Sequence, residues 1–185
     1  EDQWAPSDRL EVRRGLRTLA AGPRGTAWMP RLGVQYEVVP RVTLSLGAGR
    51  SAQAIHSLRD EESLAASLVA YDLLAGVPEE IGLTEAEDVV VGAAWSGART
   101  SLRVDAYAKR FTRLPIAPTP DELLEAPVIV TEGFVEGEGG AHGFEIQGQH
   151  RLAKAEVTLS YSYLEATRTV EGRSYAPRFA RRHTV

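Results

Sequence analysis

Apolar and polar residues alternate along six segments of this chain, and this period-two pattern constrains the fold more than any other feature of the sequence. Successive side chains of a β-strand point to opposite faces of the sheet, so the alternation predicts strands with one apolar and one polar face. The six segments are 10–17, 31–38, 42–49, 102–109, 144–149 and 156–163. A seventh segment, 89–95, is almost wholly apolar. The chain is therefore expected to be all-β, with about seven complete strands.

The connections between these segments alternate between tight and long. Tight connections rich in turn-forming residues, or just long enough to reverse the chain, are expected at 6–8, 39–41, 96–98 and 152–154. Long connections are expected at 20–26, 51–87, 112–141 and 168–180. In an antiparallel up-and-down meander, alternate connections lie at opposite ends of the sheet. One end would then carry short turns and the other long loops, which is the polarity of outer-membrane barrels.

The composition is compatible with this interpretation and argues against several other structures and functions. With 43% hydrophobic and 25% charged residues, the 185-residue chain has the balance of one folded domain. It has no run of 18 apolar residues for a transmembrane helix, but a spanning β-strand needs only about ten alternating residues. The absence of cysteine excludes thiol catalysis and cysteine-ligated zinc. A net charge of -4 gives no general attraction to nucleic acid.

No group of residues in the sequence has the spacing of a catalytic, cofactor or metal site. His56, His142, His150 and His183 lack the spacing of metal ligands. The acidic residues at 60–62, 79–80 and 85–88 are interpreted as solvated loop residues. No Gly-x-Ser-x-Gly elbow is present. We therefore expect neither an enzyme nor a bound cofactor.

The two longest connections have patterns of their own. Within 51–87, Ser57 and Asp60 have capping-box spacing, and residues 76–78 supply a stop, which predicts one helix between them. That helix would either cover the strand ends or help to shape an external ligand vestibule. Within 112–141, the apolar triplet 128–130 either contributes to the same vestibule or forms an added pair of strands.

Several stretches resemble the barrel of TonB-dependent outer-membrane receptors, in the same order along the chain. The N-terminal stretch 1–17 is similar to a strand that ends, turns and returns, and 30–50 is similar to the next hairpin. The stretch 101–109 is similar to an inner-rim strand of that family. The stretches 143–146, 159–163 and 175–183 are similar to the run of strands late in the barrel of that family. Each stretch alone is weakly specific, and the resemblance depends on all of them occurring in the same order over nearly the whole chain.

The resemblance implies a partial outer-membrane β-barrel domain spanning 1–185, located in the bacterial outer membrane. Such receptors close a 22-stranded barrel around a plug, so this chain is expected to be a fragment. The plug and the contact with TonB would lie elsewhere in the receptor. The implied function is uptake of a ligand such as a siderophore, cobalamin, a glycan or a peptide. Two alternatives stay open: a passive porin or adhesin barrel, and a soluble all-β binding module.

In a membrane barrel, the alternation assigns each face of the sheet a different environment. Leu32, Leu44, Val104, Ile146 and Leu159 are expected on the convex, lipid-facing side. Arg14 falls on the same face, so we expect it near the rim or beside a bulge at Gly15. The residues expected to face the lumen are Glu37, Arg103, Asp105, Lys109, Glu145, Gln147 and Glu156.

Overall fold

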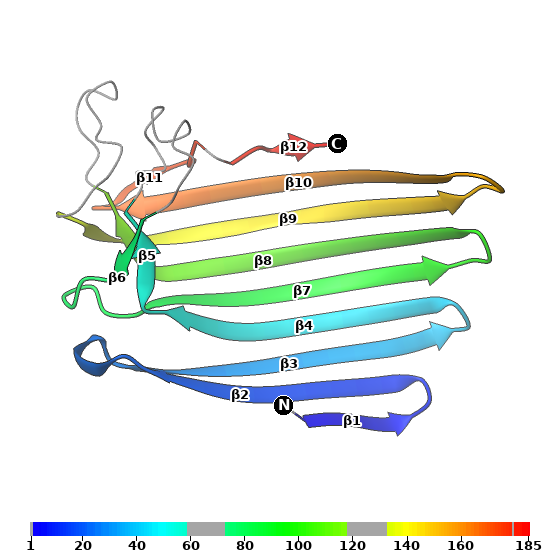
Figure 1. The fold of residues 1–185 in the computed structure, drawn as a ribbon, viewed down its shortest axis with the longest axis horizontal. Helices are drawn as coiled ribbons and strands as arrows, with labels where there is room; N and C mark the ends of the chain where they lie inside the picture. The colour runs from blue at the N-terminus through cyan, green and yellow to red at the C-terminus, as the bar shows by residue number, and fades with distance from the viewer. Residues whose placement is uncertain (1, 59–72, 118–132, 179) are drawn as a thin grey trace.

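The computed structural model describes residues 2–58, 73–117, 133–178 and 180–185, and their dominant feature is one antiparallel sheet (Figure 1). Its long strands are β2 (Leu10–Ala20), β3 (Thr26–Val39), β4 (Val42–Gln53), β7 (Thr84–Ser96), β8 (Thr100–Ile116), β9 (Val135–Arg151) and β10 (Glu156–Val170). The shorter strands of this sheet are β1 (Asp2–Ser7), β11 (Arg173–Tyr175) and β12 (His183–Thr184). A separate two-stranded sheet joins β5 (Ile55–Ser57) to β6 (Leu74–Gly76). A short 3-10 helix, η1, spans Gly22–Arg24.

The strands of the large sheet follow one another in chain order, β1-β2-β3-β4-β7-β8-β9-β10-β11, and β12 pairs with β10. The all-β prediction and the antiparallel meander are confirmed, with seven long strands. Tight turns lie at the four expected places. At Pro40-Arg41, proline precedes a residue with a φ of 76°, as in a type II turn. A closed barrel is not observed in the described residues.

The strands extend further towards the loop end than the alternation predicted. The connection expected at 51–87 runs from 54 to 83, and the one expected at 112–141 runs from 117 to 134. The connection expected at 20–26 is only five residues long, and 168–180 contains the tight β10–β11 hairpin. The helix expected after Ser57 and the triplet 128–130 lie largely outside the described residues, although Ser57 itself ends β5 and Gly76 ends β6.

The cross-strand register places the large hydrophobic side chains on one face of the sheet, here called the apolar face. One row of directly paired residues across it is Val34, Leu46, Val91, Ala106, Phe144 and Tyr163. The exposed large residues of this face are Trp4, Leu16, Trp28, Leu32, Tyr36, Leu44, Leu46, Val89, Val91, Trp95, Leu102, Val104, Phe144, Ile146, Val157 and Leu159. Their exposed fractions run from 36% at Phe144 to 66% at Leu159. The five residues expected on one face therefore share it.

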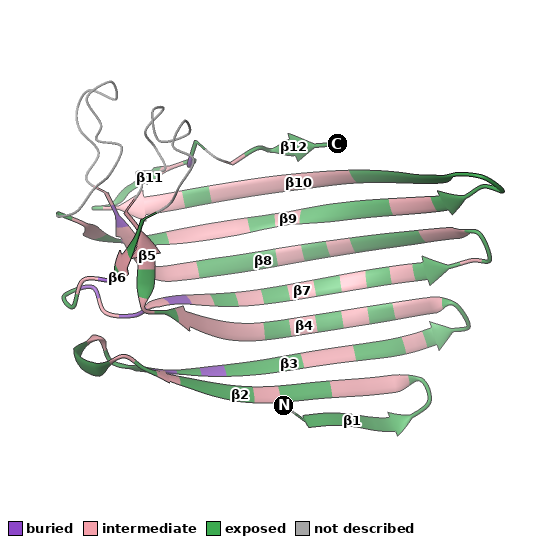
Figure 2. Ribbon diagram, in the orientation of Figure 1, coloured by how far each residue is buried: buried purple, intermediate pink, exposed green. Residues whose placement is uncertain are grey.

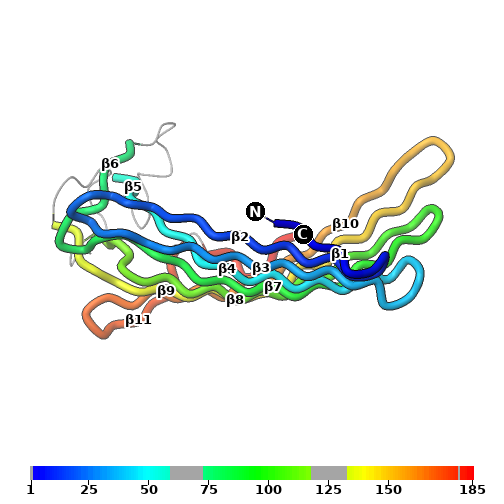
Figure 3. Tube along the Cα trace, turned by 90° about the horizontal axis from the view of Figure 1, so that it is seen from below, coloured from blue at the N-terminus to red at the C-terminus, as the bar shows by residue number. Residues whose placement is uncertain are grey.

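No second sheet packs on the apolar face within the described part of the chain. Seen edge-on, the strands form a single layer, with β5 and β6 at the loop end (Figure 3). The buried residues gather at that same end, as Figure 2 shows. They include Ala27 and Met29 at the start of β3, Leu83 just before β7 and Ile116 at the end of β8. The middle of the sheet thus has no core of its own.

Arg14 does not lie beside a bulge, contrary to that part of the sequence expectation. The pairing of β2 with β3 is regular from Leu10 to Ala20. Arg14 lies on the apolar face, opposite Leu32 on one side and Asp2 on the other. Its Nη2 atom is 3.4 Å from Oδ2 of Asp2, so the charge on this face is paired.

We predict that this chain, expressed alone in plain buffer, aggregates and becomes dispersed only in detergent. The reason is that an exposed apolar sheet face with open edges pairs and packs with other copies. Size-exclusion chromatography with light scattering, with and without detergent, measures this. A monodisperse monomer that melts cooperatively in buffer would contradict the prediction.

Candidate functional site

The face opposite the apolar face, here called the polar face, carries all seven residues predicted to face a lumen. Arg103 pairs with Gln147, Asp105 with Glu145, and Lys109 with Ala141. Glu37 pairs with Thr43, and Glu156 with Arg151. Each of the seven alternates with residues of the apolar face along its strand. Whether the polar face lines a lumen stays a prediction.

Four of these seven residues come together in one hollow on β8 and β9. The hollow measures about 400 Å³ and is lined by Val90, Arg103, Asp105, Tyr107, Glu145 and Gln147. A second hollow shares Val90 and Arg103 with it and continues over β2, β3 and β4 to Glu11 and Arg13. Together the two hollows form one trough across the sheet, lined by charged, polar and apolar residues.

An ion pair between Arg103 and Asp105 is the fixed element of this trough. The Nε and Nη2 atoms of Arg103 donate to the Asp105 carboxylate at 2.6 and 2.9 Å. The two residues are two positions apart on β8 and so point to the same face. Because Glu145 lies directly opposite Asp105, two carboxylates and one guanidinium share this spot. The group thus presents both negative and positive charge to the hollow.

Two glycines make room for the larger side chains of the trough. A Cβ atom at Gly92 would clash with the carboxylate of Asp105 and the hydroxyl of Ser45. A Cβ atom at Gly143 would lie 2.9 Å from the hydroxyl of Tyr107 and would clash with the backbone of Tyr163. These glycines let the side chains of neighbouring strands lie flat against the sheet.

The other three predicted residues lie apart from the hollow. Glu156 accepts hydrogen bonds from Gln149 and Arg151 at the short-turn end of β10. Glu37 accepts a hydrogen bond from the backbone of Arg41 in its own turn. The ammonium of Lys109 lies 5.8 Å from the ring centroid of Phe111. The sequence reasoning did not single out Glu11, Arg13 or Tyr107, although each occupies a polar-face position in the alternation.

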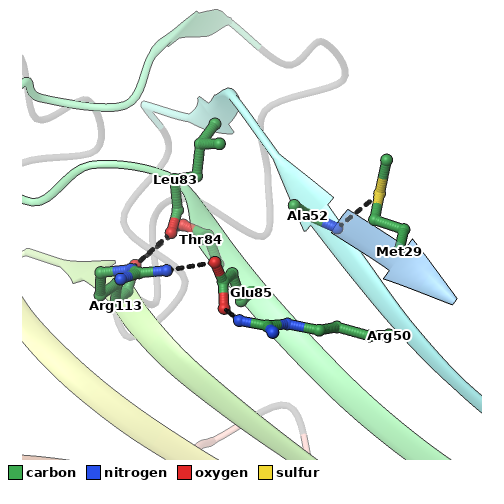
Figure 4. A network of polar contacts seen from close by, with 7 residues as sticks. All are labelled: Met29, Arg50, Ala52, Leu83, Thr84, Glu85 and Arg113. Atoms are coloured by element: carbon green, nitrogen blue, oxygen red, sulfur yellow. Dashed lines mark hydrogen bonds and ion pairs between the residues drawn. The ribbon is translucent and has the colours of Figure 1, made fainter. Parts of the chain in front are cut away.

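A second polar cluster ties three strands together at the loop end of the sheet (Figure 4). Glu85 at the start of β7 is 9% exposed and forms ion pairs with Arg50 of β4 and Arg113 of β8. Arg113 also donates from Nε to the carbonyl of Leu83 at 2.8 Å. The hydroxyl of Thr84 donates to the carbonyl of Arg113 at 2.9 Å. We call Arg50, Glu85 and Arg113 the rim clamp.

The rim clamp corrects the interpretation of residues 85–88 as solvated loop residues. They belong to β7, and Glu85 is nearly buried. The geometry depends on Arg113, whose φ of 55° lies in the left-handed region, at a register shift between Phe111 and Leu114. This bulge turns the Arg113 side chain back towards β7. The clamp thus fixes strand ends from which both long connections, 54–83 and 117–134, start or finish.

His56 on β5 makes the only described ring contact between these two connections. Its ring meets Phe134 edge to face, with the centroids 4.5 Å apart. Both ring nitrogens are buried without a hydrogen-bond partner among the described residues. Burial lowers the pKa of His56 below its usual 6.5, because the charged ring loses its hydration. The contact therefore favours neutral histidine.

Within the described residues, no three histidine, cysteine or carboxylate side chains are grouped so as to hold a metal ion. No helix there has the length and apolar character needed to cross a membrane. Comparison of the chain with models of known protein families, with curated proteins and with solved structures gives no match. The two faces of the sheet and its two ends are therefore the features of the molecule that bear on its function.

We predict that Glu85→Gln lowers the free energy of unfolding by about 1–3 kcal/mol, because two arginines lose a charged hydrogen-bond partner. The matched control is Glu138→Gln, which removes an exposed ion pair with Arg110 at 3.6 Å. That change should cost less than about 1 kcal/mol. Urea denaturation in the same detergent compares the two variants. Equal losses would show that the rim clamp contributes no more than a surface ion pair.

We predict that the contact of His56 with Phe134 loosens as the pH falls below about 6.5, the ordinary pKa of histidine. The folded pKa is lowered, so the unfolded segment binds the proton first, and acid favours its opening. Protection factors of the β5–β6 amides, in which the fall of the intrinsic exchange rate with pH is divided out, should decrease between pH 7.5 and 5.5. In His56→Phe this decrease should disappear. The same decrease in the variant would assign the pH effect to another group.

Proposed function

We propose that this chain forms part of the barrel wall of a TonB-dependent receptor in the bacterial outer membrane. The complete receptor would take up a ligand such as a siderophore, cobalamin, a glycan or a peptide. The chain itself would carry out no reaction. Its partners would be membrane lipid on one face and the plug domain of the same receptor on the other, with TonB acting through that plug.

The observation that carries this proposal is that a single sheet has one open apolar face and one polar, charged face. A soluble sandwich buries its apolar face against a second sheet, but here that face is open across seven strands. The opposite face holds the charged trough, with Arg103 and Asp105 at its centre. Lipid outside and water or a plug inside suit these two faces.

The unequal ends of the sheet also support the proposal. Every turn at one end is short, while the longest connections, 54–83 and 117–134, lie at the other end. Long loops on a rigid scaffold are the usual place for ligand binding. The rim clamp gives these two connections a fixed base. The ligand would therefore be selected by the loops and not by the wall.

Uptake that depends on TonB separates this function from a passive porin. Cells that carry the complete receptor should grow on one of the candidate ligands as sole source of iron, cobalamin, carbon or amino acids. The same cells without TonB should lose that growth while the receptor stays in the outer membrane. Growth that continues without TonB would favour a passive barrel.

We predict that Val104→Asp impairs assembly of the receptor in the outer membrane, whereas Asp105→Ala leaves it largely intact. The first change sets a carboxylate against hydrocarbon, at a cost of roughly 2–3 kcal/mol near the bilayer centre. The second removes a partner of Arg103, whose side chain is 59% exposed on the polar face and stays hydrated. Heat-modifiable migration of outer-membrane fractions on gels reports the assembled share. Equal defects, or a larger defect from Asp105→Ala, would show that the faces are assigned the wrong way round.

A further inference from the structure

The polar face carries two buried apolar residues at the loop end of β3. Ala27 and Met29 share this face with Arg31, because side chains two residues apart on a strand point the same way. They are only 3% and 5% exposed, whereas Trp28 between them is 59% exposed on the apolar face. A part of the protein therefore covers the start of β3 from the polar side and leaves the apolar side open.

Residues 73–83, here called the arm, run from β6 to the start of β7 and form a compact segment. The amides of Ile81 and Gly82 donate to the carbonyl of Pro78 at 3.2 and 3.0 Å, which closes a turn. Val77 is completely buried, and Ile81 is 6% exposed. Figure 3 shows β6 standing out from the layer of the sheet at the loop end. The arm thus has an apolar side that packs against other parts of the protein.

Arg24 joins the arm to the start of β3. Its Nε atom donates to the carbonyl of Val77. Its guanidinium lies against Gly76, where a Cβ atom would be 2.9 Å from Nη2 and 3.3 Å from Cζ. Gly82 also lies close, since a Cβ atom there would be 3.4 Å from the carbonyl oxygen of Arg24. Arg24 ends η1, three residues before Ala27, so the arm docks beside the buried residues of β3.

The far end of the arm is held at β8. The Nε atom of Arg113 donates to the carbonyl of Leu83 at 2.8 Å. In the sheet, β4 and β7 lie between β3 and β8. Arg24 and Arg113 therefore belong to strand ends that are three strand spacings apart, roughly 14 Å. The arm is thus tied to the loop ends of strands on both sides of β4 and β7.

We propose that the arm is a strap across the polar face at the loop end, where it covers Ala27 and Met29, and that Arg24 is the latch that holds it there. The strap keeps a ligand off the start of β3 and narrows the entrance to the polar face. This inference rests on the receptor proposed above and adds a fixed element to its mouth. Arg24 is a positioning residue, because it acts on a ligand only through the arm.

Cysteine labelling of the complete receptor in intact cells tests the strap. This chain contributes no cysteine of its own, and any others in the receptor are replaced. The reporter is Ala27→Cys, and its rate of reaction with a water-soluble maleimide that does not cross membranes measures opening of the arm. The rate is compared with Arg24 intact, in Arg24→Gln and in Gly76→Val, whose side chain would displace the guanidinium. The matched control is Arg17→Gln, which removes an exposed guanidinium of β2 opposite Met29.

The reporter should react slowly while Arg24 is intact. In Arg24→Gln the rate should rise roughly 10- to 100-fold, because a hydrogen bond from a charged group no longer opposes opening of the arm. Gly76→Val should give a similar increase, and Arg17→Gln a change of no more than about twofold. Combining Arg24→Gln with Gly76→Val should add little, because both changes remove the same contact.

Three results would overturn the strap. Rapid labelling of Ala27→Cys with Arg24 intact would show that the arm does not cover β3. Slow labelling in every variant, with rapid labelling once urea unfolds the receptor, would show that Arg24 is not the latch. An equal increase in Arg17→Gln would assign the effect to the loss of positive charge and not to the contact with the arm.

A second cysteine, Leu32→Cys, reports on the membrane location instead. Leu32 lies on the apolar face and is 45% exposed, so lipid alone should shield it from the reagent whether the arm is latched or open. Rapid labelling of Leu32→Cys would contradict the membrane location, whatever the result at Ala27. A failure of the strap and a failure of the proposed function are therefore told apart.

Discussion

The register that runs without interruption across the middle of the sheet is the constraint on which the rest of the structure depends. Side chains alternate with a period of two, so a slip of one residue would exchange the faces of a whole strand. The shifts in the meander between β2 and β10 lie beside the turn after Glu37 and near the loop end of β8. Between them the alternation continues from strand to strand. Backbone hydrogen bonding, and not a packed core, therefore keeps the apolar residues of seven strands on one face.

This constraint explains why much of the fold could be predicted from the sequence. Strand alternation is local, so it identified the seven long strands and the shared face of residues as distant as Glu37 and Glu156. The strand ends were harder to predict because their chemistry changes. On β7, Glu85 and Glu87 occupy the same face as Val89, but a charge in that position does not continue the apolar pattern. A hydropathy pattern ends where the environment changes, whereas the strand ends only where its hydrogen bonds do.

The candidate sites could not be predicted from any single segment of the sequence, because each site joins residues of different strands. Glu85 is paired with arginines 35 residues before it and 28 residues after it, and the bulge at Arg113 orients one of them. The gathering of Asp105 and Glu145 depends on the register between β8 and β9, two strands that are joined by the long connection 117–134 and not by a tight turn. Alternation showed that these residues point the same way. It could not show which of them lie side by side, because that depends on long-range pairing.

The middle of the sheet and its loop end differ in how they are stabilised, and this difference bears on function. The middle has an open apolar face, so a surrounding apolar medium would add stability there that the chain does not supply. The loop end has buried apolar side chains of its own and the rim clamp between β4, β7 and β8. Both long connections are thus anchored by contacts that need no membrane. In the proposed receptor, the surrounding lipid would stabilise the wall and the loop base would be held by its own contacts, so the two could change independently. Changes within 54–83 and 117–134 would then alter the ligand bound while the faces and register of the wall stay the same.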